Sequence, residues 1–510
     1  MIEEILILDF GSQYTQLIAR KIRELKVFCE IVPYNFPIEE ARQKNLKGII
    51  LSGGPASVLE PDSYICDEEY FNLGLPMLGI CYGLQLMGKV MGGKLLRAES
   101  REYGPALMTP SLDNPLWNGD LESSRVWMSH GDSLEQLPQG FRNIGQTSSV
   151  EHAAIADLER GMYALQFHPE VFHTAKGKQF LQNFLINICK VSCDWSMESF
   201  IEDSVKKIRE TVGDKRVLCA ISGGVDSSVC ALLLSKAIGK KLTSVFVNNG
   251  LLRKNEEFQV IEELKSLDVD VRMVDASDLF LGRLEDVTDP EKKRKIIGRT
   301  FIEVFELEAG KLGEVDYLAQ GTLYPDVIES VSFKGPSATI KSHHNVGGLP
   351  EHMNMKLIEP LRELFKDEVR ELGEKLGLKR ELLWRHPFPG PGLAVRILGE
   401  ITRPRLELLR EADHIFIQAL RDFGEYDNVW QAFCVLLPVQ AVGVMGDERT
   451  YENVLALRAV SSTDGMTADW SRLPADLLEF VSSTIVNKIK GINRVVYDVS
   501  SKPPATIEWE

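Results

Sequence analysis

The chain has 510 residues, and its content of hydrophobic (44%), aromatic (8%) and charged (26%) residues is that of a globular protein. A chain of this length is expected to form about three domains. The 74 acidic residues outnumber the 58 basic ones, and the net charge of -16 argues against nucleic acid as a partner.

The sequence shows no clear pattern for membrane insertion, secretion or metal binding. No apolar run is long enough to cross a membrane, and the opening MIEEILILDFG has acidic residues where a signal peptide has basic ones. We therefore expect a cytoplasmic protein without membrane association. The eight cysteines include no CxxC pair, so neither a zinc site nor a disulfide framework is predicted, and we expect no prosthetic group.

The first part of the chain alternates short apolar runs with glycine turns and helical segments. The runs EILILDFG, KGIILSGGP and LPMLGICYG each end in a glycine turn, and the first is followed by the helical pattern SQYTQLIARKIRELK. This order predicts a doubly wound parallel sheet over residues 1–192, with its chemistry at the carboxyl ends of the strands.

A second cycle of strands and helices begins after a polar stretch near residues 191–195. The runs RVLCAISGG, KLTSVFVNNG and VDVRMVDAS again end in glycine or polar turns, which predicts a second doubly wound parallel sheet over residues 193–385. The segment RHPFPGPG breaks helices and is typical of an interdomain connection. The remaining residues, 386–510, mix helices with strands and predict a smaller α+β domain.

The first candidate site is a cysteine elbow. Cys81 lies between a buried strand and a helix, with Gly79 and Gly83 where a nucleophile elbow needs a tight turn. A helix that starts at Tyr82 directs its positive end at the sulfur, which favours an anionic nucleophile. Because a lone cysteine in such a place is more often a buried structural residue, the elbow needs a base to support it.

A histidine at the end of a later strand supplies that base. His168 is followed two positions later by Glu170, and residues i and i+2 of an extended chain face the same way. Glu170 is therefore expected to orient His168, which accepts the proton of Cys81, as in acyl transfer.

These motifs, with the turn SGGP at residues 52–55, resemble the class I glutamine amidotransferases over about the first 190 residues. The resemblance implies that Cys81 forms a glutamyl thioester, with His168 as base and then acid. It also implies an oxyanion hole and a glutamine pocket, and His130 is expected to position glutamine or to be structural rather than to act as the base. The residues implied for these two roles are Gly54, Tyr82, Gln85, Ser129 and His130.

The second candidate site is a loop between a strand and a helix, where successive N–H groups can hold phosphate oxygens. It lacks the lysine of a Walker A loop and resembles the SGGxDSS signature of ATP pyrophosphatases, which release pyrophosphate from ATP. The residues expected to bind ATP are Ser222, Gly223, Gly224, Val225, Asp226, Ser227 and Ser228.

Further residues are candidates for the same site. Asp226 is a hard oxygen ligand suited to Mg²⁺ on the pyrophosphate, although a helix cap is its alternative role. Gly321 follows a strand and could admit the adenylate, and Lys366 could bind pyrophosphate or be a solvated surface cation. The polar stretch at residues 339–350 predicts a lid, whose adjacent His343 and His344 point apart and are not expected to bind a metal.

A glutaminase fused to an adenylating domain implies an ATP-dependent amination. With the closing segment DVSSKPPATIEWE, the chain resembles the glutamine-hydrolysing GMP synthases over nearly its whole length. That family uses glutamine, ATP with Mg²⁺, and XMP, which is adenylated and then aminated to GMP, and it forms homodimers. The XMP contacts that the resemblance implies are Arg294, Gln431, Asp447, Lys502 and Glu508, although Arg294 lies in the run EKKRK, which could equally be a solvated helix face.

Two other functions remain open at this stage. A tRNA-modifying or other adenylating enzyme would share the loop, but it should show a basic RNA-binding region, which the acidic balance disfavours. A metabolite-sensing scaffold would have lost part of the cysteine site or of the loop, whereas both are complete in this sequence.

Overall fold

The computed structural model describes residues 3–312, 315–331, 355–445, 448–462 and 467–510. Within it the chain forms two compact units, the first made of Met1–Phe200 with Leu323–Gly348 and the second of Ile201–Thr322 with Leu349–Glu510. The predicted lid with His343 and His344, and the XMP candidate Asp447, lie outside the described residues.

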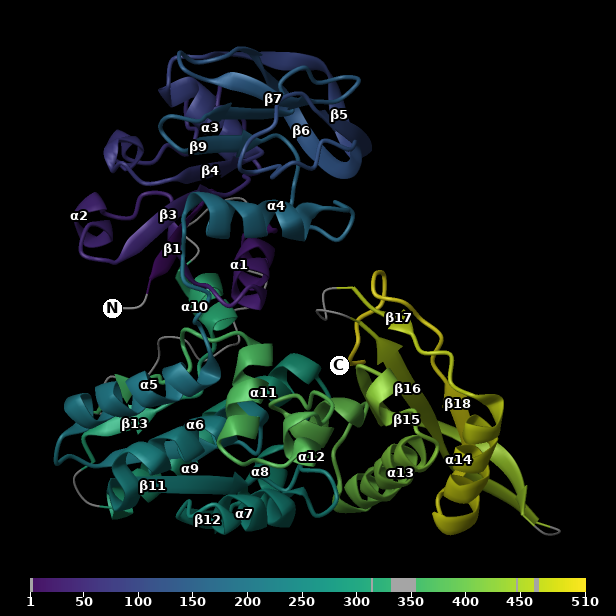
Figure 1. Ribbon diagram of the computed structural model, residues 1–510. Helices are drawn as coiled ribbons and strands as arrows, with labels where there is room; N and C mark the ends of the chain where they lie inside the picture. Colours follow the sequence, from purple (N-terminus) through teal and green to yellow (C-terminus); the bar gives the residue numbers. More distant parts are fainter. Residues whose placement is uncertain (1–2, 313–314, 332–354, 446–447, 463–466) are drawn as a thin grey trace. The chain divides into compact units, whose positions relative to one another are not determined.

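The first unit is organised around one mixed sheet, in the strand order β2-β1-β3-β4-β9-β8-β7-β5-β6 (Figure 1). The strands from β2 to β9 in this order run parallel, as predicted, whereas the strands beyond β9 pair antiparallel. The strands are β1 (Glu4–Asp9), β2 (Phe28–Pro33), β3 (Leu46–Leu51), β4 (Met77–Ile80), β5 (Lys94–Pro110), β6 (Ser124–Gln136), β7 (Arg142–Gln146), β8 (Ala154–Asp157) and β9 (Met162–Leu165).

The parallel strands are short and buried on both faces, which explains their unbroken apolar runs. Every residue of β4 is buried, and β1 is buried from Glu4 to Leu8. Helices cover the sheet, and α1 contacts α4 directly (Figure 1). The helical elements of this region are α1 (Thr15–Glu24), α2 (Ile38–Ala41), η1 (Glu68–Asn72), α3 (Tyr82–Val90), α4 (Gly177–Asn183) and η2 (Phe184–Ile188).

The first unit also takes in a helix from far along the sequence. Helix α10 (Tyr324–Val331) belongs to this unit, although the sequence analysis assigns residues 193–385 to the second domain. The hydroxyl of Tyr324 accepts a hydrogen bond from the backbone N–H of Ile31 on β2, and the tyrosine is buried. Burial also raises the pKa of Tyr324 well above its usual value, so that its hydroxyl stays neutral.

The second unit contains a parallel sheet in the order β12-β11-β10-β13-β14. The helices lie on both of its faces, because Leu218 of β10 packs with residues of α8 and α9, whereas Cys219, the next residue, interacts with Cys230 of α6. The strands are β10 (Val217–Ile221), β11 (Leu242–Asn248), β12 (Val271–Asp275), β13 (Tyr317–Ala319) and β14 (Lys356–Ile358).

The helices that accompany this sheet include α6, which contacts both β10 and β11 and is buried along most of its length. They are α5 (Met197–Val212), α6 (Val225–Ile238), η3 (Gly239–Lys241), α7 (Glu256–Ser266), α8 (Ser277–Arg283), α9 (Pro290–Lys311), α11 (Lys366–Lys375), α12 (Arg380–Leu383) and η4 (Gly392–Arg396).

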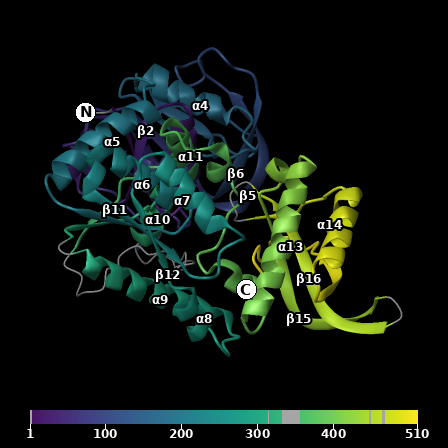
Figure 2. The same ribbon diagram turned by 90° about the horizontal axis from the view of Figure 1, so that it is seen from below.

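The last part of the second unit is a small α+β layer. Long strands β15 (Gln431–Met445) and β16 (Glu448–Ser461) pair antiparallel, and β16 also pairs with β17 (Asp469–Trp470) and, in parallel, with β18 (Ile492–Tyr497). Helices α13 (Arg403–Asp422) and α14 (Ala475–Lys488) lie side by side against this sheet (Figure 2), and a short turn of helix, η5 (Tyr426–Asn428), precedes β15.

The predicted fold class is confirmed in its main features: parallel α/β sheets followed by an α+β portion. The difference is the antiparallel extension of the first sheet, which the sequence analysis did not predict. Among the described residues, no helix is both long enough and apolar enough to span a membrane.

Candidate functional site

The first site is built on a strained turn between a buried strand and a helix. Cys81 connects β4 to α3, and its backbone has φ 52° and ψ -101°. A positive φ is unfavourable for a residue with a side chain, and such strain is often retained at functional turns. The cysteine is only 5% exposed, and its thiol donates a hydrogen bond to the carbonyl oxygen of Ser129 at 3.4 Å.

The two glycines that flank the turn are required by close backbone contacts. A Cβ atom at Gly79 would lie 2.6 Å from the carbonyl oxygen of Gly83, and one at Gly83 would lie 2.4 Å from the carbonyl oxygen of Leu51. Real side chains do not tolerate such distances. The close packing of α3 against β3 and β4 therefore requires the two glycines of the GxCxG pattern.

His168 and Glu170 form a buried pair that faces Cys81. Nδ1 of His168 lies 2.6 Å from Oε1 of Glu170, and both residues are buried. Burial alone lowers the pKa of His168, but the charge of Glu170 and the interactions with Cys81 and Glu170 outweigh it and raise this pKa well above its usual value. The surroundings of His168 therefore favour its protonated form.

The imidazole is also held in place by its surroundings. The ring of Tyr14 meets that of His168 edge to face at 5.2 Å, and the backbone N–H of His168 donates to the carbonyl of Trp127 at 3.0 Å. A Cβ atom at Gly53 would approach Cε1 of the imidazole to 3.2 Å. The SGGP turn therefore closes over the histidine, which explains the glycine at position 53.

His130 also has a carboxylate partner, but from another strand. Its Nε2 lies 3.3 Å from Oε2 of Glu102 on β5, and its Nδ1 lies 3.1 Å from the carbonyl oxygen of Asp132. The sequence spacing does not distinguish His130 from His168 as the base. Asp132 follows His130 by two positions, just as Glu170 follows His168. Burial lowers the pKa of His130, so the two histidines differ in charge preference rather than in spacing.

Other predicted residues of the glutamine site gather around the same turn. The side-chain amide of Gln85 on α3 donates to the carbonyl of Asp132 at 2.9 Å, and the carboxylate of Asp132 accepts the hydroxyl of Ser57. Gly54 lies against the ring of Tyr82, since a Cβ atom there would be 3.1 Å from its Cγ. The N–H of Tyr82 is in the first position of α3, where no helical carbonyl can accept it.

The second site is the loop between β10 and α6. Gly223 has φ 79°, and a Cβ atom there would lie 3.3 Å from the ring of Phe246. Hydroxyl groups hold the turn together, because Ser227 bonds to Ser222 at 3.2 Å and donates to the carbonyl of Gly224 at 3.1 Å. With its hydroxyls bonded to the backbone, the loop leaves the first N–H groups of α6 for an anion.

Asp226 and Lys366 meet at this helix end. Asp226 lies in the first turn of α6, after the N-cap Gly224, and its Oδ1 is 2.6 Å from Nζ of Lys366 at the start of α11. Gly321 packs against the same turn, since a Cβ atom there would be 3.1 Å from the carbonyl oxygen of Asp226. The structure thus brings together the loop and the two residues predicted from distant segments.

The donor set around Asp226 fits Mg²⁺ that arrives with a phosphate ligand. In the described ranges, no cluster of three or more His, Cys, Asp or Glu side chains could hold a metal ion alone. Mg²⁺ next to ATP is commonly held by one or two carboxylates together with phosphate oxygens. The single carboxylate of Asp226 matches that arrangement, and Lys366 occupies part of it in this structure.

Two of the residues predicted to contact XMP are in direct contact with each other. The amide of Gln431 donates to Oε1 of Glu508 at 2.8 Å. Glu508 also pairs in a bidentate manner with Arg396, which is fully buried, at 2.9 and 3.2 Å. The guanidinium of Arg396 lies over the ring of Phe433.

The basic run EKKRK divides between the interior and the surface. Lys293 is fully buried and donates to the carbonyl oxygens of Ala394 and Ile397 and to the carboxylate of Glu510. Its neighbour Arg294 is partly exposed and donates to the backbone oxygen of Glu510 at 2.6 Å. The sequence analysis did not foresee this contact of Arg294 with the closing segment, and the predicted contact with XMP stays a prediction.

Lys502 is fixed through its backbone. Its N–H donates to the carbonyl of Ala468 at 2.7 Å, and its carbonyl accepts from the N–H of Ala468 at 3.0 Å. Arg458, fully buried, donates to backbone carbonyls at Ser500, Thr506 and Ile507. The closing segment is therefore part of the fold rather than a frayed end.

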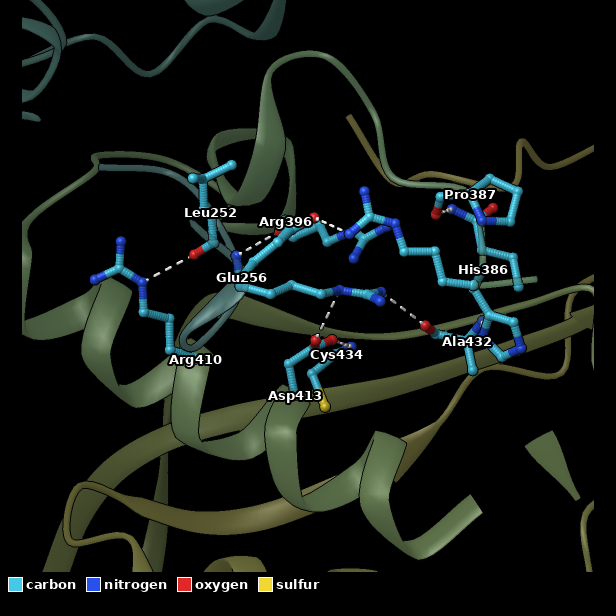
Figure 3. Close-up of polar contacts among 12 residues, drawn as sticks. Leu252, Glu256, His386, Pro387, Arg396, Arg410, Asp413, Ala432 and Cys434 are labelled. Carbon is cyan, nitrogen blue, oxygen red and sulfur yellow. Dashed lines mark hydrogen bonds and ion pairs between the residues drawn. The ribbon is translucent and has the colours of Figure 1, made fainter. Parts of the chain in front are cut away.

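A buried polar cluster that the sequence analysis missed joins the parallel sheet to the α+β layer (Figure 3). Arg253 pairs with Asp413 of α13 at 3.1 Å and donates to the carbonyl of Ala432. Burial lowers the pKa of His386 to about 4, and its neutral ring bonds to the carbonyl of Tyr426 and to the N–H of Ala432. The only sequence signal here is the RHPFPGPG segment.

Family comparisons agree with the two sites. The family "Glutamine amidotransferase class-I" matches residues 6–188, and "GMP synthase C terminal domain" matches residues 418–509. The family "tRNA methyl transferase HUP domain" matches residues 215–278, which contain the phosphate loop and its strands. This last match covers only part of the second unit.

Relatives of similar length match the whole chain. The chain is 58% identical over 510 residues to the GMP synthase (glutamine-hydrolyzing) of Nitratidesulfovibrio vulgaris, with 99% of each chain covered. It is 60% identical over 519 residues to the enzyme of the same name from Chlorobium phaeobacteroides, with 100% of each covered. The crystal structure of a putative GMP synthase component from Thermoplasma acidophilum is 29% identical over 37% of this chain and 95% of its own, with a TM-score of 0.33.

Proposed function

The chain belongs to the family of glutamine-hydrolysing GMP synthases, and from this premise we propose that Cys81 and the loop at residues 222–228 are its glutaminase and synthetase sites. An enzyme of this family hydrolyses glutamine to ammonia and uses ATP to adenylate XMP, which ammonia converts to GMP with release of AMP. The full-length relatives decide against a tRNA-modifying enzyme, because they match every part of the chain.

In the proposed glutaminase, His168 takes the thiol proton of Cys81, and the sulfur attacks the amide carbon of glutamine. The thioester forms as the carbon–nitrogen bond breaks, and His168 gives its proton to the departing ammonia. His168 then takes a proton from the water that hydrolyses the thioester. The observation that carries this assignment is the strained Cys81 turn facing a buried His168–Glu170 pair.

The oxyanion of the tetrahedral intermediate needs fixed donors. We assign this role to the backbone N–H groups of Gly54 and Tyr82, because the two residues are in contact beside Cys81 and the Tyr82 N–H lacks a helical acceptor. We assign the binding of glutamine to Gln85, Ser129 and His130, whose contacts lie around the same turn.

In the proposed synthetase, residues 222–228 hold the phosphates of ATP through the N–H groups at the start of α6. Asp226 would hold the Mg²⁺ of the nucleotide, which supplies charge neutralisation at the phosphates. Lys366 moves from Asp226 to the pyrophosphate when the nucleotide binds, because a triphosphate is the stronger anion. Gly321 leaves room for the adenylate beside Asp226.

For XMP we propose contacts from Arg294, Gln431, Lys502 and Glu508, and also from Asp447, which lies outside the described residues. The contact between Gln431 and Glu508 supports a common site, since Arg396 fixes the carboxylate and leaves Oε2 a further lone pair. Residues 386–510 would form this third domain, after boundaries at residues 192 and 385.

We further propose a homodimer formed through the α+β layer. Val442 and Tyr451 are opposite each other on β15 and β16, and Val444 follows on the same face. All three are more than half exposed, which is unusual for apolar side chains on one strand pair. Sedimentation of the full chain would report the dimer directly.

We also propose that the enzyme acts in the cytoplasm. Its cysteines are all free, and its glutaminase requires a reduced thiol at Cys81. Glutamine, ATP and XMP are the small-molecule partners, and we propose neither nucleic acid nor membrane as a partner.

The function is tested by following the O2 oxygen of XMP. The chain is supplied with ATP, Mg²⁺, glutamine and XMP labelled with ¹⁸O at O2, and the products are analysed by mass spectrometry. Adenylation at O2 followed by amination transfers the label to the phosphate of AMP, in an amount equal to the GMP formed. Label retained in the ring, or GMP formed without AMP, would contradict the proposal.

A further inference from the structure

The phosphate loop has an arginine neighbour to which no role has been assigned. Arg385 precedes His386 in the segment between α12 and η4. Its Nη2 lies 4.0 Å from the position that a Cβ atom of Gly223 would occupy, so the guanidinium borders the loop directly. The side chain is 16% exposed, which leaves it largely enclosed by protein.

Arg385 is held by one carboxylate through only one of its nitrogen atoms. Nη1 donates to Oε1 of Glu256 at 3.0 Å, while Oε2 of Glu256 accepts the backbone N–H of Arg253 at 3.1 Å. Among the described residues, Nη2 has no acceptor of its own. The nitrogen that borders Gly223 is therefore available to a ligand, while Glu256 fixes the plane of the guanidinium.

The charges around Arg385 also favour an incoming anion. Arg253 lies near enough to oppose its charge, and burial together with Arg253 lowers the pKa of Arg385 while Glu256 offsets part of this effect. Arg253 is paired with Asp413, and Arg385 with Glu256, so each of these two carboxylates is already engaged by a guanidinium. Lys366 reaches the same loop through Asp226, so cations approach the loop from two segments.

We propose that Arg385 is a catalytic residue of the adenylation step and donates Nη2–H to the β-phosphate of ATP, which leaves as pyrophosphate. The inference rests on the proposed phosphate-binding role of residues 222–228. In that step a bond forms between O2 of the ionised XMP ring and the α-phosphorus, and the bond from the α-phosphorus to the bridging oxygen breaks. The electron pair stays on pyrophosphate, where the guanidinium stabilises it.

The residues next to Arg385 link this contact to the proposed XMP site. His386 accepts a hydrogen bond from the N–H of Ala432 at 3.1 Å (Figure 3). Ala432 follows Gln431, which donates to Glu508. Gln431 also donates to the carbonyl of Pro387 at 3.1 Å. Residues 385–387 thus hold Arg385 next to β15, the strand on which the XMP candidate Gln431 lies.

The test is the binding of inorganic pyrophosphate with Mg²⁺ to the full-length protein by titration calorimetry. Arg385→Gln is expected to weaken binding about tenfold to a hundredfold, since it removes a hydrogen bond from a charged donor. The matched control Arg380→Gln removes an exposed arginine five residues earlier and should leave binding unchanged. Glutaminase activity should also be unchanged in Arg385→Gln, because its site lies in the first unit.

A second variant keeps the test decisive if Arg385→Gln does not fold. Arg385→Lys retains the charge and the pairing with Glu256 but loses the planar fork, so its pyrophosphate affinity should fall between those of the wild type and Arg385→Gln. Unchanged affinity in a folded Arg385→Gln, or in Arg385→Lys when only that variant folds, would overturn the inference. Failure of the wild type itself to bind pyrophosphate would instead overturn the proposed role of the loop.

Discussion

The cysteine site of the first unit and the phosphate loop of the second are built in opposite ways. Cys81, His168 and Glu170 are all buried, and a strained backbone and close glycine contacts fix the thiol before any substrate arrives. At the loop, Asp226 and Lys366 have side chains that are 30% and 44% exposed and pair with each other. We therefore propose that the charged substrate completes the phosphate site.

This difference agrees with the chemistry that we propose for each site. A covalent nucleophile must be aligned with its base within a fraction of an ångström, which requires packing. A phosphate site needs mainly positive charge and free N–H groups, which flexible cations can supply on binding. Substitutions in the first unit should therefore change the alignment and protonation of the catalytic groups. Substitutions in the second unit should change the binding of the charged substrate.

The largest effect is expected from Glu170→Gln. The loss of the carboxylate charge should lower kcat with glutamine roughly 10²- to 10⁴-fold, because His168 loses its orienting and stabilising partner. Activity with ammonium salt should not change. The exposed Glu159→Gln serves as the control, and a parallel loss with both nitrogen donors would show that Glu170 acts on the fold instead.

The pH profile of the same variant sharpens the test. Glu170 raises the pKa of His168 against the opposing effect of burial, so without its charge this pKa falls. The imidazolium must give a proton to ammonia, and the alkaline limb of the glutaminase profile should therefore move to lower pH. An alkaline limb that stays at the wild-type pH would contradict the assignment of His168 as the acid.

Asp226→Asn should have the next largest effect and the opposite pattern. It keeps the size of the side chain but removes the charge proposed to hold Mg²⁺, so GMP formation at limiting Mg²⁺ should fall about 10²-fold with glutamine and with ammonium alike. The exposed Asp203→Asn is the control. An unchanged rate at limiting Mg²⁺ would show that Asp226 pairs with Lys366 but does not hold Mg²⁺.

Glu508→Gln is expected to act on XMP alone. It weakens the pairing with the buried Arg396 and alters the proposed XMP site, so the KM for XMP should rise at least about tenfold. The KM for glutamine in the glutaminase assay should stay constant, and the exposed Glu479→Gln provides a control. Normal XMP saturation would remove Glu508 from the site.

The smallest effect on chemistry but a clear effect on stability is expected for Gly83→Ala. The added Cβ atom would lie 2.4 Å from the carbonyl oxygen of Leu51, and such overpacking typically costs ~1–3 kcal/mol. At Gly298 of α9 a Cβ atom meets nothing within 4 Å, so Gly298→Ala should be neutral or stabilising. Denaturant unfolding compares the two, and equal stabilities would contradict the packing argument.

The sequence predicts those parts of the molecule whose chemistry is local. The elbow at Cys81 and the loop at Gly223 each join a strand to a helix, so residue type and spacing alone locate them. His168 and Glu170 lie two positions apart at the end of one strand, and the geometry of an extended backbone directs both side chains to the same side. Spacing alone does not distinguish His168 from His130, which Asp132 follows by two positions, so the choice between the two histidines depends on tertiary contacts.

Contacts between distant segments were not predictable in this way. Tyr324 belongs by sequence to the second parallel cycle, yet it bonds to Ile31 on β2. Lys293 lies in a basic run typical of a surface, yet it is buried because backbone carbonyls and Glu510 satisfy its charge. Among the antiparallel strands beyond β9, β6 alternates buried and more exposed residues and so lacks the long apolar run of a parallel strand.

The most direct test of the separation between the two sites is GMP formation by Cys81→Ala, measured with saturating ATP and XMP and with either glutamine or ammonium chloride as nitrogen donor. Only the thioester step uses the sulfur, so activity with glutamine should fall to background while activity with ammonium chloride stays near that of the wild type. Equal loss with both donors would contradict the account.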